Sequence, residues 1–250
     1  MSGHNKWSTI KHRKGAQDAK RSRLFTKIIR EITVAARNGG GDPAGNPRLR
    51  RAIEDAKAAN MPSENIERAI KKGTGQLDGV RLESLTYEGV GPGGTLFLVD
   101  IVTDNRNRTA PEVRKIFERH GGQLGASGSA AWAFEEKGVL KIPAEASSEE
   151  QLFEVAVGAG AEDLEQVGEH WVVRTGREDY EAVRGALDEA GIPVEEASLG
   201  PVPKTVKVVD GPEAEKNVAL FEALENHDDV ENVAADFELS EAALQRLQTS

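Results

Sequence analysis

The chain has 250 residues, of which 38% are hydrophobic and 30% are charged, and its formal net charge is -10. It contains no Cys, which excludes disulfides, thiolate nucleophiles and Cys-based zinc sites. No stretch approaches the length of an apolar membrane span, and the first residues lack the apolar region of a secretory signal. A chain of this length is expected to form two or three domains, and we expect it to be cytoplasmic.

The charge is distributed very unevenly along the chain. Residues 1–75 hold 17 Lys or Arg and 7 Asp or Glu, which is a net of +10. The other 15 basic and 35 acidic residues give 76–250 a net of -20. This asymmetry predicts a polyanion-binding module attached to an acidic body. The alternative is a solvated basic helix that also pairs with the acidic domains.

The basic segment is predicted to form a small helical bundle. Apolar residues from Leu24 to Ala36 follow helical spacing, which indicates an amphipathic helix. A glycine-rich segment then ends the helix, and Asn46 can cap a second helix with Pro47 at its first position. A third helix is predicted over 63–72, followed by a short linker.

The next segment alternates between strands and a helix. Strands are predicted over 82–90 and 94–104, with a GPGG hairpin turn between them. Residues 89–94, at the end of the first strand and in the turn, match G-x-G-x-x-G. A dinucleotide site needs a helix after this loop, and here a strand follows. A helix is predicted over 109–121, with Thr109 as its cap, and a further strand over 130–136.

A regular series of elements follows in the order strand, helix, strand, strand, helix, strand. This βαββαβ order over 139–201 is the ferredoxin-like pattern. A helix over 212–226 and a strand over 230–238 have no partner nearby, so we expect them to complete the preceding domain. The predicted fold is therefore α+β, with an N-terminal three-helix domain followed by two ferredoxin-like α/β sandwich domains. The expected boundaries are 1–78, then 79–136 with 204–250, and an inserted domain at 137–203.

The residues show no catalytic or metal-binding constellation. The five His are scattered, and no Walker-type nucleotide loop occurs. Acid pairs such as Asp228 and Asp229 are abundant in a segment with 35 acids and carry little information. We expect no enzyme activity, no cofactor, no metal and no small-molecule substrate.

Basic residues near the N-terminus are the main candidates for contact with a nucleic acid. Lys and Arg attract phosphates regardless of sequence, and an aromatic ring can stack on an unpaired base. For Trp7 the alternative is packing against the bundle. The candidates are Lys6, Trp7, Lys11, His12, Arg13, Lys14, Lys20, Arg21, Arg23, Lys27, Arg30, Arg48, Arg50 and Arg51. A second candidate contact, for which helix capping and solvated charge are the alternative, consists of Arg106, Arg108, Arg114 and Lys115.

Three long segments of the chain resemble one family, the YebC/PmpR family. They are GHNKWSTIKHRKGAQDAKRSRLFTKI, GGGDPAGNPRLRRAIEDAKAANMPSENIERAIKKGTG and YEGVGPGGTLFLVDIVTDNRNRTAPEVRKIFERHGGQLGASGSAAWAF. The resemblance is dense from Gly3 to Phe134 and looser beyond. One departure is Asn5, where the family usually has Ser, and this small polar replacement puts little in doubt.

The resemblance implies a three-domain, cytoplasmic, non-enzymatic protein that regulates gene expression. The family is named for DNA-binding transcriptional regulation, and relatives that include a mitochondrial one are tied to translation on the ribosome. The sequence shows no helix–short turn–helix and no zipper heptads, and phosphate and shape readout suits structured RNA at least as well as DNA. The expected partner is therefore DNA, or ribosomal RNA or tRNA on the ribosome, bound by a monomer. A protein-interaction adaptor is a further alternative.

Overall fold

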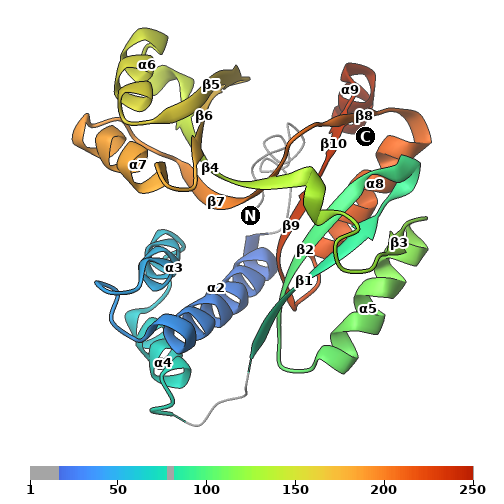
Figure 1. The fold of residues 1–250 in the computed structure, drawn as a ribbon, viewed down its shortest axis with the longest axis horizontal. Coiled ribbons are helices and arrows are strands. Elements are labelled where there is room, and N and C mark those ends of the chain that lie inside the picture. The colour runs from blue at the N-terminus through green and yellow to red at the C-terminus, as the bar shows by residue number, and fades with distance from the viewer. Residues whose placement is uncertain (1–16, 78–81, 250) are drawn as a thin grey trace.

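In the part of the N-terminal region that the structure describes, residues 17–77, three helices form a bundle (Figure 1). The computed structural model describes residues 17–77 and 82–249. The helices are α2 (Gln17–Gly39), α3 (Pro47–Ala58) and α4 (Ser63–Gly73). Their buried side chains form one apolar cluster, as the helical spacing from Leu24 onward predicts. The predicted bundle is therefore confirmed.

Asn46 holds the connection between α2 and α3. Its side-chain oxygen accepts a hydrogen bond from the Leu49 amide at 3.1 Å, which is the N-cap arrangement that the sequence predicts. Its amide group also donates to the carbonyls of Ala35 at 2.8 Å and Gly40 at 2.9 Å. Because Asn46 is only 4% exposed, its side chain satisfies helix-end groups on both sides of the connection from within the protein.

The middle domain is built on a four-stranded sheet with the order β3-β1-β2-β9. Strands β1 (Glu83–Val90) and β2 (Leu96–Thr103) form the predicted hairpin, and Gly93 and Gly94 have φ of 71° and 74° in its turn. Helices α5 (Arg106–Arg119) and α8 (Gly211–Glu225) pack on the sheet through a cluster that contains four Phe residues. Strand β9 (Val230–Ala235) pairs antiparallel with β2, as a discontinuous middle domain requires.

The third domain has the predicted βαββαβ order. It consists of β4 (Phe134–Pro143), α6 (Glu149–Gly158), β5 (Ala161–Val167), β6 (His170–Gly176), α7 (Tyr180–Glu189) and β7 (Glu196–Pro203). The sheet order is β5-β6-β4-β7, and both helices contribute to its apolar core. Helices followed by two sheet-containing domains confirm the predicted α+β fold (Figure 1).

Three local predictions differ from the structure. The strands expected over 130–136 and 139–142 are one continuous strand, β4, and all of it lies in the third sheet. The strand that follows α5 in the middle sheet is instead β3 (Gln123–Leu124), which is too short to show a hydrophobic pattern between its flanking glycines. Helix α5 begins at Arg106 and is capped by Asn105, so the predicted cap Thr109 lies inside the helix.

The C-terminal region contains elements that the sequence did not reveal. The strand expected over 230–238 is interrupted at Asp236, whose carboxylate accepts a hydrogen bond from the Leu96 amide at 2.7 Å. The chain then forms β10 (Phe237–Leu239), which pairs in parallel with β8 (Lys207–Val209), and ends in α9 (Glu241–Thr249). We propose the domain division expected from the sequence, with the boundary near 136 moved to the start of β4.

Replacement of Asn46 is expected to destabilise the helical domain. Asn46→Ala removes the cap, the buried hydrogen bond to the carbonyl of Ala35 and the partly buried one to the carbonyl of Gly40, so the free energy of unfolding should fall by about 2 kcal/mol. Asn46→Ser keeps a capping oxygen and should lose less. Urea unfolding followed by circular dichroism measures both, and Asn38→Ala, at an exposed position of α2, is the control. Equal midpoints for Asn46→Ala and the control would contradict this role.

Candidate nucleic-acid interface

The predicted basic residues fall into three groups in the structure. Six of the candidates lie outside the described residues, namely Lys6, Trp7, Lys11, His12, Arg13 and Lys14. Lys20, Arg21 and Arg23 belong to the first turns of α2. The remaining candidates lie on α2, α3 and α5, where their surroundings are defined.

Lys27 and Arg30 on α2 face the middle domain. The Lys27 ammonium donates to the carbonyl of Glu225, the last residue of α8, at 2.9 Å. The Arg30 guanidinium donates to the Asp229 carboxylate at 2.9 Å and to the carbonyl of Asp228. These two cations therefore join the helical domain to the middle domain.

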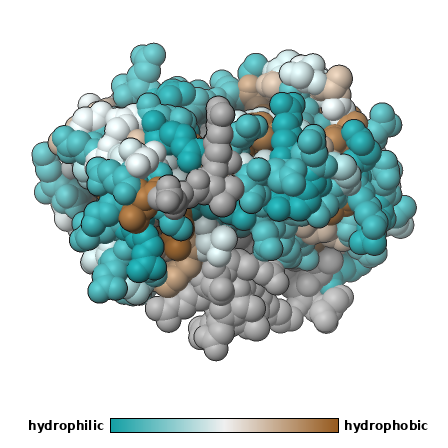
Figure 2. Space-filling view, turned by 90° about the horizontal axis from the view of Figure 1, so that it is seen from below, coloured by the Kyte–Doolittle hydropathy of each residue, from teal (hydrophilic) through white to brown (hydrophobic). Residues whose placement is uncertain are grey.

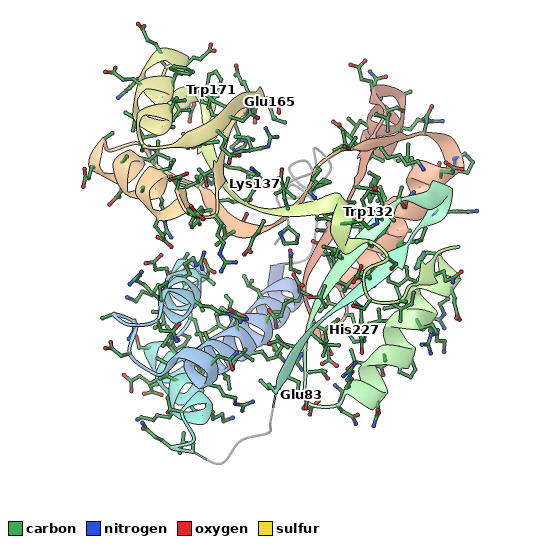
Figure 3. All side chains as sticks on the ribbon, in the orientation of Figure 1. Glu83, Trp132, Lys137, Glu165, Trp171 and His227 are labelled. Carbon is green, nitrogen blue, oxygen red and sulfur yellow. The ribbon has the colours of Figure 1, made fainter. Side chains whose placement is uncertain are left out.

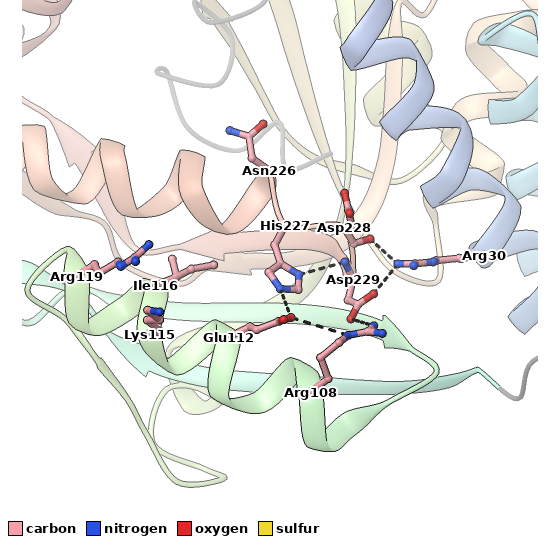
Figure 4. A pocket seen from close by; sticks show the side chains of 10 residues that line it. All are labelled: Arg30, Arg108, Glu112, Lys115, Ile116, Arg119, Asn226, His227, Asp228 and Asp229. Carbon is pink, nitrogen blue, oxygen red and sulfur yellow. Dashed lines mark hydrogen bonds and ion pairs between the residues drawn. The ribbon is translucent and has the colours of Figure 1, made fainter.

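Asp229 is the residue on which these contacts converge (Figure 4). Its side chain is 2% exposed, and one carboxylate oxygen accepts from Arg30. The other oxygen accepts from Arg108 at 2.6 Å, from Thr109 at 2.7 Å and from Thr103 at 3.1 Å. Two arginines that the sequence assigns to separate nucleic-acid contacts thus share one internal acid. We name this group of five residues the Asp229 cluster.

The cluster favours the ionised carboxylate. Burial alone would raise the pKa of Asp229, but the hydrogen bonds from Thr109 and Arg108 and the charge of Arg30 outweigh burial. The pKa of Asp229 therefore lies below its usual value. Arg30 and Arg108 both pair with this almost fully buried carboxylate. Loss of its charge would therefore leave both arginines without this anion.

The arginines of α3 also have partners within the protein. Arg48 forms a two-pronged ion pair with Glu31 at 2.6 and 2.8 Å, and Arg50 donates to the carbonyl of Pro43 at 3.3 Å. Arg51 lies over the ring of Tyr180, 5.7 Å from its centre. Together with an ion pair of 2.8 Å between Glu54 and Arg184 on α7, this contact joins the helical domain to the third domain.

Helix α5 carries cations on its exposed surface. Arg106, Arg114 and Lys115 are exposed, whereas Arg108 contacts both Asp104 and Asp229. A cleft of about 590 Å³ lies between α5 and the connection from α8 to β9. Its walls include Lys115 and Arg119 as well as Arg30, Arg108 and Asp229 of the cluster (Figure 4). The face seen in Figure 2 is mainly hydrophilic, which suits contact with a charged partner.

His227 and Glu112 form the inner wall of the cleft. The His227 Nδ1 accepts from the Asp229 amide at 3.1 Å, so the Nε2–H donates to Glu112, also at 3.1 Å. This pair turns the Glu112 carboxylate toward His227 and Arg108. The cleft is therefore a mixed ionic surface with an excess of cations at its α5 edge.

Asp229 and Arg119 are among the residues of this region that sequence reasoning missed. Asp229 was grouped with abundant acid pairs, and its partners lie about 120 and 199 residues away along the chain, beyond any local pattern. Arg119 follows Lys115 by four residues, so helical periodicity could have placed both on the same face. The short connection between α3 and α4, residues 59–62, was also not expected, because no helix–short turn–helix was found in the sequence.

The described residues were also compared with the requirements of a membrane span and of a metal site. No described helix is long and apolar enough to cross a bilayer. Within the same residues, no group of three or more His, Asp or Glu side chains is arranged to hold a metal ion.

Comparison with known proteins gives consistent matches over nearly the whole chain. The model of the TACO1/YebC N-terminal domain matches residues 5–76, and the model of the TACO1/YebC second and third domain matches residues 82–237. A curated relative from Desulfatibacillum aliphaticivorans, named "Probable transcriptional regulatory protein", is 52% identical over 98% of this chain and 99% of its own length. A relative with that same description from Geobacter sulfurreducens is 51% identical over 99% of this chain and 100% of its own.

One solved structure has the same architecture. The crystal structure of a conserved hypothetical protein from Aquifex aeolicus is 49% identical and has a TM-score of 0.86. The similarity covers 94% of this chain and 97% of that chain, so it includes all three domains.

Loss of the Asp229 charge is expected to destabilise the protein in a pH-dependent way. Asp229→Asn should lower the free energy of unfolding by about 1–3 kcal/mol at pH 7, because the two arginines lose their anion. Because the folded-state pKa of Asp229 is depressed, this contribution is present above the unfolded pKa of about 3.9 and disappears as pH falls through the folded value. Urea midpoints from pH 7 to pH 3 measure this effect. Asp228→Asn, at the exposed neighbour, is the control.

At Glu231, which lies on β9 beside α2, we expect the opposite effect: removal of the charge should stabilise the protein. Burial is the largest cause that raises the pKa of Glu231, to about 8, and the negative charge of Glu31 also raises it. The positive charges of Lys27 and Arg30 oppose this shift. A raised pKa means that ionisation weakens the folded state as pH rises above about 4.3. Glu231→Gln should therefore stabilise the protein by an amount on the order of 2 kcal/mol at pH 8 and by much less at pH 5. Thermal unfolding at both pH values tests this, and an equal gain at both would contradict it.

Proposed function

Because the chain belongs to the TACO1/YebC family, we propose that it is a non-enzymatic, nucleic-acid-binding regulator of gene expression that acts as a cytoplasmic monomer. The observation that carries the proposal is the net charge of +10 in residues 1–75 against -20 in the remainder. A polyanion is attracted to the first segment and repelled by the second. The names of the relatives as probable transcriptional regulatory proteins support this function.

The internal contacts narrow the surface that we assign to the nucleic acid. Lys27, Arg30, Arg48 and Arg51 all contact groups within the protein. A phosphate would have to compete with those groups, which reduces the gain from binding there. We therefore assign phosphate binding mainly to Lys6, Lys11, Arg13, Lys14, Lys20, Arg21 and Arg23. The exposed cations of α5, namely Arg106, Arg114 and Lys115, are the second contact.

The charge of α4 favours readout of phosphates over readout of base pairs. Helices α3 and α4 are joined by four residues, 59–62, as in a helix-turn-helix. In that motif the N-terminal residues of the second helix contact base edges between two phosphate backbones. Here the first turn of α4 carries the exposed Glu64 and no basic residue, the exposed Glu67 is followed by Arg68, and Lys71 and Lys72 lie in the last turn. Acidic side chains in that position would be repelled by DNA.

This charge pattern supports a second candidate function, the binding of structured RNA by a translation factor. RNA is recognised largely through its shape, its phosphates and its unpaired bases, and this recognition needs no helix in a major groove. The names of the relatives favour DNA, whereas the acidic start of α4 favours RNA. Both functions use the same basic N-terminal segment.

The basic segment should bind with a strong dependence on salt. Log affinity should fall linearly with log salt concentration, by roughly 0.7 to 0.9 for each phosphate contact. The double variant Lys11→Ala/Lys14→Ala should weaken binding to all sequences and flatten the slope by about one to two units. Fluorescence anisotropy with two unrelated DNA duplexes and one structured RNA measures this.

The double variant Arg174→Ala/Arg177→Ala is the matched control. It changes the net charge by the same amount, but its arginines pair with acids of the third domain. The control should keep the wild-type slope. A larger loss on the RNA than on both duplexes would favour the translation factor, and a loss confined to one duplex would favour the transcriptional regulator. Equal slopes for the two double variants would refute the assignment to the N-terminal segment.

A further inference from the structure

The side chain of Trp132 is unusually exposed. Of the large apolar side chains in the described residues it has the greatest exposure, 67%. Trp side chains are on average largely buried, since their area gives a large gain when it leaves water. Trp132 lies just before β4, where the chain passes from the middle domain to the third (Figure 3).

The loop that carries this ring is firmly held. The Glu88 carboxylate on β1 accepts hydrogen bonds from the amides of Gly128 and Ala130, both at 2.6 Å, and of Ala131 at 2.8 Å. Burial alone would raise the pKa of Glu88, but these three amides outweigh it and the pKa is lowered. Glu88 is therefore a fixed anchor for residues 128–131.

The ring itself is fixed from its polar edge. The indole N–H of Trp132 donates to the carbonyl of Ser129 at 3.1 Å, and the neighbouring Ala130 and Ala133 are buried. Both residues pack with Leu98 and Ala234 of the middle sheet. The single polar atom of the ring is thus satisfied within the protein, while the aromatic surface faces water. An aromatic ring held in this way loses little entropy when a partner stacks on it.

A cation contacts the backbone of Trp132. The Lys204 ammonium donates to the carbonyl of Trp132 at 2.9 Å, and the Lys204 amide donates to the carbonyl of Ala133, also at 2.9 Å. One carbonyl uses one of three ammonium donors, and the contacts among the described residues leave two donors and the full charge available. The nearest acids along β4 have cationic partners: Glu135 lies 3.8 Å from Lys137, and Glu136 pairs with Arg177.

We propose that Trp132 is a stacking platform for an unpaired nucleobase and that Lys204 binds an adjacent phosphate. This inference rests on the proposed nucleic-acid-binding function and names the kind of nucleic acid: a single-stranded segment or loop. Every base has a π face, so a stacking site tolerates different sequences, and a neighbouring cation binds the backbone. A duplex keeps its bases stacked on one another and offers this platform no free face.

The test compares binding of a single strand and a duplex by full-length variants. The probes are a fluorescein-labelled 12-nucleotide oligouridine and a labelled RNA duplex of equal length. Trp132→Ala should weaken binding of the single strand by roughly 5- to 100-fold and change duplex binding little. Trp132→Phe keeps a π face and should retain most of the affinity. Phe153→Ala is the control, because Phe153 is 57% exposed on α6 of the third domain.

The fluorescence of Trp132 provides an independent measurement. In the double variant Trp7→Phe/Trp171→Phe, Trp132 is the one remaining Trp of the three in the chain. Its emission should be quenched when unlabelled oligouridine binds, because a stacked base quenches the indole directly. Circular dichroism before titration verifies that each variant is folded.

The outcomes separate this inference from the proposed function. If the wild type binds both probes and Trp132→Ala binds the single strand equally well, stacking on Trp132 is refuted while nucleic-acid binding stands. If the wild type binds neither probe, stacking is refuted, and if it also binds neither of the DNA duplexes used in the salt titration, the proposed function fails with it. A third outcome is that Trp132→Ala halves the molecular mass of the protein in sedimentation and does not selectively weaken its binding to the single strand. That result would show that the ring contacts a second copy of this chain and would overturn the inference.

Discussion

The buried carboxylate of Asp229 is the interaction on which the arrangement of the molecule depends. It lies just before β9 and receives hydrogen bonds from α2 of the helical domain and from α5 of the middle domain. An ionised carboxylate that is 2% exposed is tolerated because cations and hydroxyl groups satisfy both oxygens. Arg30 can meet this acid only when α2 lies against the α8–β9 connection. The ion pair therefore fixes the position of the helical domain.

The positive charge of the helical domain thus has two uses. Some cations bind the acidic domains: Arg30 binds Asp229, and Arg51 lies over Tyr180 on α7. The remaining excess is concentrated toward the N-terminus, where Lys6 to Arg23 includes seven basic residues and one acid. The contrast between +10 and -20 therefore describes how the domains hold together as well as what the protein is proposed to bind.

The sequence predicted those features that short-range chemistry determines. Asn46 was identified as a cap from its position before Pro47, and the hairpin between β1 and β2 from its glycines and the strand that follows Gly94. It did not predict β3, because two residues cannot show a periodicity. It also divided β4 into two strands, because Gly138 interrupts the apolar pattern. The tertiary pairing with β6 and β7 continues through that glycine.

The candidate site was harder to predict than the fold, for the same physical reason. A basic residue on a helix face has the same sequence pattern whether it binds a phosphate or a distant acid. Arg30 and Asp229 are separated by 199 residues, and only the tertiary structure brings them together. The exposure of an apolar residue cannot be predicted from its sequence neighbours either. Trp132 and Trp171 both lie beside apolar neighbours in the sequence, yet they are 67% and 8% exposed.

Strand β9 links the proposed contacts physically. The Asp229 cluster lies at its beginning, and Ala234 near its end packs beneath the loop that carries Trp132. Six residues of strand span roughly 20 Å, so α5, through Arg108 and Asp229, and the Trp132 ring are attached to the two ends of one short element. When two weak contacts are held at a fixed separation, binding at one raises the effective concentration of the ligand at the other. A nucleic acid that combines phosphates at the exposed cations of α5 with an unpaired base at Trp132 would gain affinity from both contacts. A uniform duplex would gain from the first alone, so the distance between the two contacts would itself select partners with unpaired bases.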